Sequence, residues 1–108
     1  MLRKIECYLR PSKLEGLRDL ILEQGLDGMS VTDARGFGSA SEKVDGVPLF
    51  EHRVRVEIIV NEDKVDQVLA GLKRLAVTGE IGAGKVFVIP VEDALRLSTR
   101  EQGRSALF

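Results

Sequence analysis

The sequence predicts an α+β fold in which two helices cover one face of a four-stranded sheet, in the βαββαβ order of the ferredoxin-like topology. Three observations lead to this prediction. Residues 3–10 and 52–60 alternate between apolar and polar side chains, as half-buried strands do. A segment with apolar residues at helical spacing follows each of them. A short apolar run at residues 86–89 completes the order, and residues 1–108 are long enough for one domain with a modest core.

The first helix is expected between a proline and a glycine. Pro11 stops the strand at residues 3–10, and Ser12 with Glu15 forms the capping-box pattern of a helix start. Gly25 follows the helical pattern, in the position that favours a left-handed C-terminal cap. The apolar stripe of this helix consists of Leu14, Leu17, Leu20 and Ile21.

The middle of the chain is predicted to form two strands joined by a loop. The first is expected over residues 28–37. Residues 38–51 show no period and mix glycine, serine, proline and charged residues, so a long mobile loop without regular structure is expected. Residues 52–60 form the next strand, whose apolar face consists of Val54, Val56, Ile58 and Val60.

The second helix is expected to begin at Asn61. Asparagine is a preferred N-cap residue, and Glu62 and Asp63 follow it in the turn where the helix dipole favours negative charge. The apolar stripe consists of Val65, Val68, Leu69, Leu72, Leu75 and Ala76. A final strand is expected at residues 86–89, ended by Pro90.

One face of the predicted sheet has no helix to cover it. Both helices of this topology lie on the same side, and the other side carries a mixture of charged and partly apolar side chains. These are Glu6, Tyr8, Arg10, Arg53, Arg55, Glu57 and Ile59. Such a face suits paired charges between subunits, so we expect an oligomer that closes over it, the alternative being a solvated face.

Composition excludes several classes of function. The net charge is −1, with 16 basic and 17 acidic residues, which gives no basic excess for nucleic-acid binding. No apolar stretch approaches the length of a membrane span, and the early Glu6 argues against a signal peptide, so a cytoplasmic location is expected. One cysteine, Cys7, and one histidine, His52, cannot build a zinc site. Cys7 is expected to be a buried structural thiol, and His52 a solvated side chain.

A glycine-rich segment from Thr78 to Lys85 is the strongest local signal of function. Its glycines let backbone N–H groups approach a ligand and form a concave anion site, to which the lysine adds positive charge. The segment fits G-x-x-x-x-G-K. However, Val86 replaces the Ser or Thr that the Walker A motif needs, and a strand follows where that motif needs a helix. The alternatives are a phosphate-binding loop of another kind and a plain turn.

Four motifs in order resemble the PII signal-transduction proteins over almost the whole chain. They are Arg3–Glu6 with Arg10–Leu14, Gly36-Phe37-Gly38, the segment 78–85, and Phe87–Val91 with Leu95–Glu101. The resemblance implies a homotrimer of ferredoxin-like subunits that binds adenine nucleotides in three clefts between subunits. It also implies a T-loop at residues 39–51, which docks on transporters, enzymes or kinases. A B-loop at 78–85 and a C-loop at 92–108, which reaches in from the neighbouring subunit, complete the pattern.

The resemblance assigns roles to individual residues. Gly82, Ala83, Gly84 and Lys85 would line the phosphate cradle, and Arg96 would reach the phosphates from the C-loop. Gly36, Phe37 and Gly38 would form the base of the T-loop beside the nucleotide, with Ser30 and Glu57 near the adenine. The fixed guanidinium and ammonium groups and backbone N–H dipoles suit a polyphosphate.

Departures from the family pattern are concentrated near the distal phosphates. Ser39-Ala40 stands where the family has Arg-Gln for phosphate and for Mg²⁺ with 2-oxoglutarate, and Ser98 replaces a second C-loop arginine. We therefore expect ADP or AMP, with ATP less favoured. Residues 39–51 are shorter than in nitrogen-regulating members and contain no tyrosine, so uridylylation is not expected.

These losses point to divergent PII-like proteins associated with carboxysomes or bicarbonate transport. In that reading, bicarbonate is a co-ligand at the T-loop base, held by Gly38, Ser39, Ala40 and Ser41. The partner docked by the T-loop would be a transporter or a protein of carbon metabolism. No catalysis, cofactor or metal is expected. The alternatives are a nitrogen-regulatory PII protein that senses ATP and 2-oxoglutarate, a weak ATPase using Lys85 and Arg96, and a metal-responsive trimer like the CutA proteins.

Overall fold

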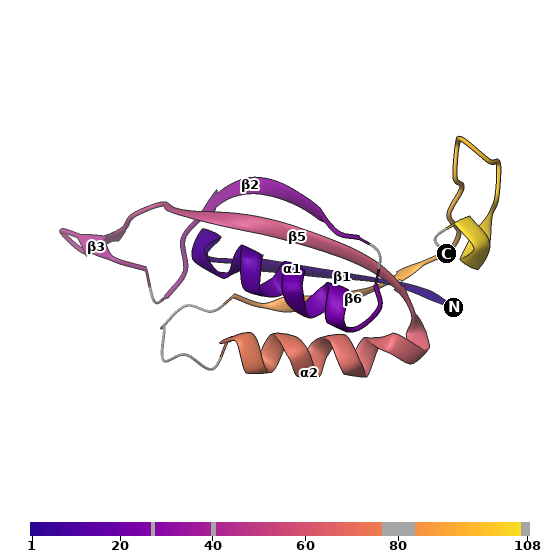
Figure 1. The fold of residues 1–108 in the computed structure, drawn as a ribbon. Helices are drawn as coiled ribbons and strands as arrows, with labels where there is room; N and C mark the ends of the chain where they lie inside the picture. Colours follow the sequence, from indigo (N-terminus) through magenta and orange to yellow (C-terminus); the bar gives the residue numbers. More distant parts are fainter. Residues whose placement is uncertain (27, 40, 77–83, 107–108) are drawn as a thin grey trace.

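A four-stranded antiparallel sheet and two helices make up the body of the molecule (Figure 1). The computed structural model describes residues 1–26, 28–39, 41–76 and 84–106. The strands run in the order β2-β5-β1-β6, and both helices lie on the same side of them. The elements are β1 Leu2–Leu9, α1 Leu14–Glu23, β2 Ser30–Gly36, β5 Glu51–Asn61, α2 Val65–Ala76 and β6 Val86–Val91. The predicted α+β, ferredoxin-like order is confirmed, with a small hairpin inserted between β2 and β5.

The core lies between the helices and the two central strands. Alternate residues of β1 and β5 are buried there against one side of each helix. This agrees with the apolar residues that recur at every second position of the strands and at helical spacing in the helices. The most deeply buried side chains are Ile5, Cys7, Leu17, Ile21, Val56, Ile58, Val60 and Val68. Burial raises the pKa of the Cys7 thiol to about 11, so the thiol stays protonated and contributes as a small apolar side chain.

The start of α1 differs from the predicted capping box. Pro11–Lys13 forms a short 3₁₀ turn that leads straight into the helix, and no side chain caps either element. Ser12 lies inside this turn, because Pro11 already has the backbone angle of a first helical residue. The Gly25 prediction is confirmed: its φ is +75°, and the Leu26 amide donates to the Ile21 carbonyl at 3.1 Å.

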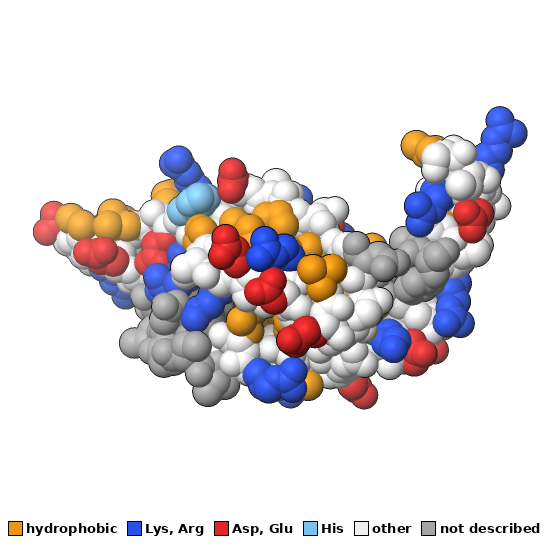
Figure 2. Space-filling view, in the orientation of Figure 1, with side chains coloured by type: hydrophobic (Ala, Val, Ile, Leu, Met, Phe, Trp, Pro, Cys, Tyr) orange, Lys and Arg blue, Asp and Glu red, His pale blue; other side chains and the backbone are white. Residues whose placement is uncertain are grey.

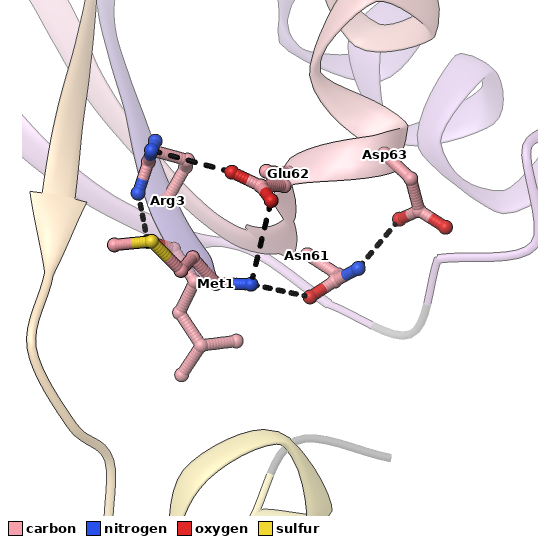
Figure 3. Close-up of polar contacts among 6 residues, drawn as sticks. Met1, Arg3, Asn61, Glu62 and Asp63 are labelled. Carbon is pink, nitrogen blue, oxygen red and sulfur yellow. Dashed lines mark hydrogen bonds and ion pairs between the residues drawn. The ribbon is translucent and has the colours of Figure 1, made fainter.

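The start of α2 is also preceded by a 3₁₀ turn, Glu62–Lys64. Asn61 occupies the N-cap position of this turn, but its side-chain amide donates to the Asp63 carboxylate at 2.9 Å and makes no cap bond. Figure 3 shows how the corner is tied to the start of β1, where Arg3 pairs with Glu62 at 3.3 Å. The predicted helix is therefore correct, whereas the predicted cap is not.

The segment between β2 and β5 contains a regular hairpin, contrary to the prediction of a loop without structure. Strands β3 (Lys43–Val44) and β4 (Val47–Pro48) pair across Asp45 and Gly46, whose φ angles are 51° and 80°. Positive φ at both central residues is the mark of a type I′ turn, which Asp-Gly favours. The hairpin projects beyond the end of the sheet (Figure 1).

β6 continues through Pro90 to Val91, where the sequence predicted a stop. Pro90 lies opposite Arg3 in the pairing with β1. The strand tolerates the proline because β6 is at the edge of the sheet. No further strand among the described residues pairs with its outer side, so a missing N–H there breaks no hydrogen bond between strands. The chain after β6 projects from the body at the end opposite the hairpin and includes the 3₁₀ turn Gly103–Ala106 (Figure 1).

Candidate functional site

A hollow of about 270 Å³ opens at the base of the hairpin, where β1 and β2 end and β5 begins. Its lining consists of Tyr8, Ala34, Arg35, Gly36, Phe37, Gly38, Ser41 and Arg53. Gly36, Phe37, Gly38 and Ser41 were among the predicted site residues. Tyr8 and Arg53 were placed only on the open face, although their strand positions put them at the same end of the sheet as Gly36. Ala34 and Arg35 were missed.

Hydrogen bonds within the chain shape the wall of this hollow. The Gly38 amide donates to the Ser41 hydroxyl at 2.8 Å, and the Ser41 amide donates to the Gly38 carbonyl at 3.1 Å. Phe37 packs edge-on against Phe50, with ring centroids 5.3 Å apart. Two of the amides expected to hold bicarbonate are thus engaged within the loop in this conformation. Ser39 is exposed, and Ala40 lies outside the described residues.

An ion pair joins the hollow to the hairpin. Glu51 and Arg53 are two residues apart on β5, so their side chains share the open face of the sheet. The Arg53 guanidinium pairs with one carboxylate oxygen of Glu51, and the other oxygen accepts the Glu42 amide at 3.1 Å. The Glu42 hydrogen bond, followed by that from Arg53, lowers the pKa of the Glu51 carboxyl from its ordinary value.

The end of the glycine-rich segment lies against the same region. A Cβ added to Gly84 would come within 2.1 Å of the Tyr8 carbonyl oxygen, so the backbone passes Tyr8 at a distance that only glycine permits. β6 begins with the pairing of Val86 and Cys7, and continuing this register by one residue puts Lys85 opposite Tyr8. Gly82 and Ala83 lie outside the described residues.

The other predicted nucleotide residues lie elsewhere in the chain. Ser30 and Glu57 are directly opposite each other on β2 and β5. Glu57 also forms ion pairs, 3.1 Å from the Lys4 ammonium and 3.5 Å from the Arg55 guanidinium. The contact between Glu57 and Lys4 raises the pKa of Lys4. Since Ser30 is six residues from Gly36 along β2, the two ends are about 20 Å apart.

Arg96 is separate from both groups. It belongs to the segment after β6, where its Nε donates to the Ala106 carbonyl at 2.8 Å and its amide donates to the Glu101 carbonyl at 2.8 Å. This segment is at the end of the molecule opposite the hairpin (Figure 1). One chain therefore places Gly36–Gly38 and Lys85 at the same end of the sheet, at its two edge strands, but brings neither Ser30 with Glu57 nor Arg96 to that end.

The polar side chains among the described residues of the lining are cationic or carry a hydroxyl group. They belong to two arginines, a tyrosine and a serine, and no carboxylate or imidazole is among the described residues that line the hollow. His52 is exposed as expected, with Nε2 3.4 Å from an Asp33 carboxylate oxygen. Within the described ranges, no three His, Cys, Asp or Glu side chains gather as a metal site. None of the described helices has the length and apolar character needed to cross a membrane.

Comparison with known proteins gives a consistent result. A family model described as nitrogen regulatory protein P-II matches residues 2–101. The nitrogen regulatory protein P-II of Bradyrhizobium diazoefficiens is 36% identical, over 98% of this chain and 100% of the relative. The P-II homolog of Oryza sativa is 38% identical over 95% of this chain and 52% of its own length. The crystal structure of Arabidopsis thaliana PII bound to citrate is similar with a TM-score of 0.83 and 37% identity, covering 97% of this chain and 91% of that one.

Proposed function

This chain belongs to the nitrogen regulatory protein P-II family, and we propose that it is a regulatory protein that binds adenine nucleotides and signals through its hairpin. The observation that supports this most is the hollow at the hairpin base. Gly36–Gly38, Ser41 and Arg53 line it, and Gly84 packs on the adjoining Tyr8 backbone. A ligand there would contact the base of the hairpin directly, so that its arrival could change the hairpin.

The charge of the hollow suits a phosphate. Arg53 belongs to the lining and lies on the open face, and Lys85 follows the closely packed Gly84. Guanidinium groups bind phosphate through fixed pairs of N–H donors, and an ammonium adds a mobile positive charge. The relative from Arabidopsis was solved bound to citrate, which is a small multivalent anion.

We place each nucleotide between two copies of a homotrimer. The phosphate residues around Gly38 and the adenine residues Ser30 and Glu57 are about 20 Å apart along β2, too far for one nucleotide within one chain. A neighbouring copy that supplies Ser30, Glu57 or Arg96 would complete the site. The open face of the sheet, with its paired charges at Lys4 and Glu57, is the contact surface we propose for this assembly.

Nucleotide preference is proposed from the residues that differ from the family pattern. Ser39-Ala40 offers no metal-ligating amide, and Ser98 offers no guanidinium, so ADP or AMP should bind better than MgATP. Bicarbonate as a co-ligand would have to displace the hydrogen bonds between Gly38 and Ser41. The hairpin would then dock on a transporter or a protein of inorganic-carbon metabolism.

Nitrogen regulation through ATP and 2-oxoglutarate is the second candidate. The observation in its favour is the description shared by the relatives from Bradyrhizobium and Oryza, both named nitrogen regulatory. Calorimetric titration with ATP, ADP and AMP separates the two, when each is run with and without Mg²⁺ plus 2-oxoglutarate and with and without bicarbonate. Synergy between ATP and 2-oxoglutarate would support nitrogen regulation, and ADP or AMP binding that bicarbonate strengthens would support carbon sensing.

The site itself is tested by Lys85→Ala. If Lys85 holds phosphate, its loss should weaken nucleotide binding by about 1.5–3 kcal/mol, the size of a hydrogen bond to a charged group. The control is Lys64→Ala, which removes the same charge from the 3₁₀ turn just before α2. This turn is at the opposite end of α2 from the glycine-rich segment, so the nucleotide affinity should be unchanged. Light scattering should show the same assembly for both variants. Equal nucleotide affinity in Lys85→Ala and the unsubstituted chain would refute the assignment.

A further inference from the structure

We propose that Glu51 is an internal anion that latches the hairpin to the sheet, and that an oxyanion ligand in the hollow releases the latch by competing for Arg53. The latch itself depends only on contacts within the chain. Its release by a ligand rests on the proposed function, since it needs an anion in the hollow that Arg53 lines.

The carboxylate of Glu51 joins three segments. One oxygen accepts the Glu42 amide at 3.1 Å, just before β3, and the other pairs with the Arg53 guanidinium on β5. The Glu42 carbonyl in turn accepts the Leu49 amide at 2.8 Å, which closes the hairpin just after β4. Both sides of the hairpin base are therefore held, directly or through one further hydrogen bond, by a single carboxylate.

The charges around Glu51 favour exchange with an external anion. Continuing the β1–β5 register by one residue beyond Leu9 and Val54 puts Arg10 opposite Arg53, and both arginines help to lower the pKa of the Glu51 carboxyl. Both guanidinium groups add to the positive potential that an external anion in the hollow would meet. The Arg53 side chain, 18% exposed, is partly shielded from water, which strengthens its interaction with whichever anion holds it.

Release would change what the hairpin presents to a partner. In the latched form the hairpin projects with Val44 and Val47 exposed near its tip, and Figure 2 shows apolar side chains at this end of the molecule beside acidic ones. A two-stranded hairpin by itself is marginally stable in water. Loss of the Glu51 contacts should therefore free its base, so that the ligand controls whether this shape is maintained.

The latch is tested first without any ligand. We would measure hydrogen exchange of the Glu42 and Leu49 amides in Glu51→Gln, and compare it with Asp45→Asn. The control removes the same charge from the same segment, and its Asn-Gly turn suits the type I′ geometry equally well. Glu51→Gln should exchange at least about fivefold faster at both amides, because a charge-assisted bond is lost. Equal exchange rates in the two variants would overturn the latch.

Release is tested by titrating the same two variants with ADP. If Glu51 competes with the ligand for Arg53, Glu51→Gln should bind ADP about threefold or more tightly than the unsubstituted chain, since coupling between two events acts in both directions. Asp45→Asn should bind as the unsubstituted chain does. ADP that binds all three equally would leave the proposed nucleotide binding standing and show that the competition is wrong. If ADP, ATP and AMP bind none of them, the proposed function and the release both fail, and the exchange data alone decide the latch.

Discussion

Alternate residues of β1 and β5 point to two faces of the same sheet that are built in opposite ways. On the helix-covered face, Ile5, Val56 and Ile58 are almost completely buried in an apolar core. On the open face, Lys4, Glu6 and Glu57 form ion pairs that remain partly exposed. Burial of an apolar side chain stabilises a fold by about 1.5–3 kcal/mol, whereas a surface ion pair contributes about 0–1 kcal/mol. The first face therefore holds the fold, and the second is free to serve recognition.

The sharpest test of this comparison uses two neighbours on β5. Ile58→Ala should lower the free energy of unfolding by about 2–4 kcal/mol, because it removes a buried side chain and leaves a cavity. Ile59→Ala, on the open face, should cost clearly less at protein concentrations where the chain is monomeric. Denaturant unfolding at several concentrations measures both. If Ile59→Ala lowers the free energy of unfolding by an amount that grows with protein concentration, assembly buries the open face. If Ile58→Ala and Ile59→Ala lower it equally at all concentrations, the two faces do not differ as proposed.

The next largest effect is expected where the glycine-rich segment meets β1. Gly84→Ala puts a methyl group 2.1 Å from the Tyr8 carbonyl oxygen, so the backbone must move, at a cost of about 1–3 kcal/mol. Gly28→Ala is the control, since no heavy atom of the described residues beyond its chain neighbours lies within 4 Å of its added Cβ. Thermal unfolding of the two variants gives the difference. Similar Tm values would mean that Gly84 does not need its close approach to Tyr8.

A smaller effect is expected from acid at the hairpin end of the open face. The Glu51 carboxyl has a lower pKa in the folded chain than the ordinary value of about 4.3, so its contribution is present above that value. The contribution is lost as the pH falls through the lowered pKa. The NMR shift of the Glu42 amide should report this titration and should stop titrating in Glu51→Gln. A Glu42 shift that titrates equally in both would assign the effect to another group.

Much of the fold could be predicted from the sequence, because the spacing of apolar residues along a strand or helix identifies the face that it buries. Alternation predicted a strand with one buried face at Val54, Val56 and Ile58, and helical spacing predicted a helix with one buried side around Val68. These residues are buried in the core. The hairpin was missed although its signal was present: Asp45-Gly46 is a preferred type I′ turn, and only the two-residue length of its strands hid the alternation.

The site was less predictable for a different reason. The roles of Gly36–Gly38 were predicted from the family resemblance, and Lys85 was singled out first from its glycine-rich segment. Strand pairing places them at one end of the sheet. The role of Glu51 was missed because the predicted strand began at residue 52, which left Glu51 in the loop and concealed that it shares a face with Arg53. Its bond to the Glu42 amide depends on how the hairpin folds back, which a pattern of side chains does not encode.

The smallest expected effect separates a sequence pattern from the structure that it suggests. Ser12 and Glu15 match a capping box, and a serine cap is worth about 1 kcal/mol. In the structure, however, Pro11–Lys13 forms a 3₁₀ turn in which no side-chain cap bond exists. Ser12→Ala should thus change the free energy of unfolding by less than about 0.5 kcal/mol, as exposed substitutions without a specific role do. A loss near 1 kcal/mol in denaturant unfolding would show that Ser12 caps α1 in solution.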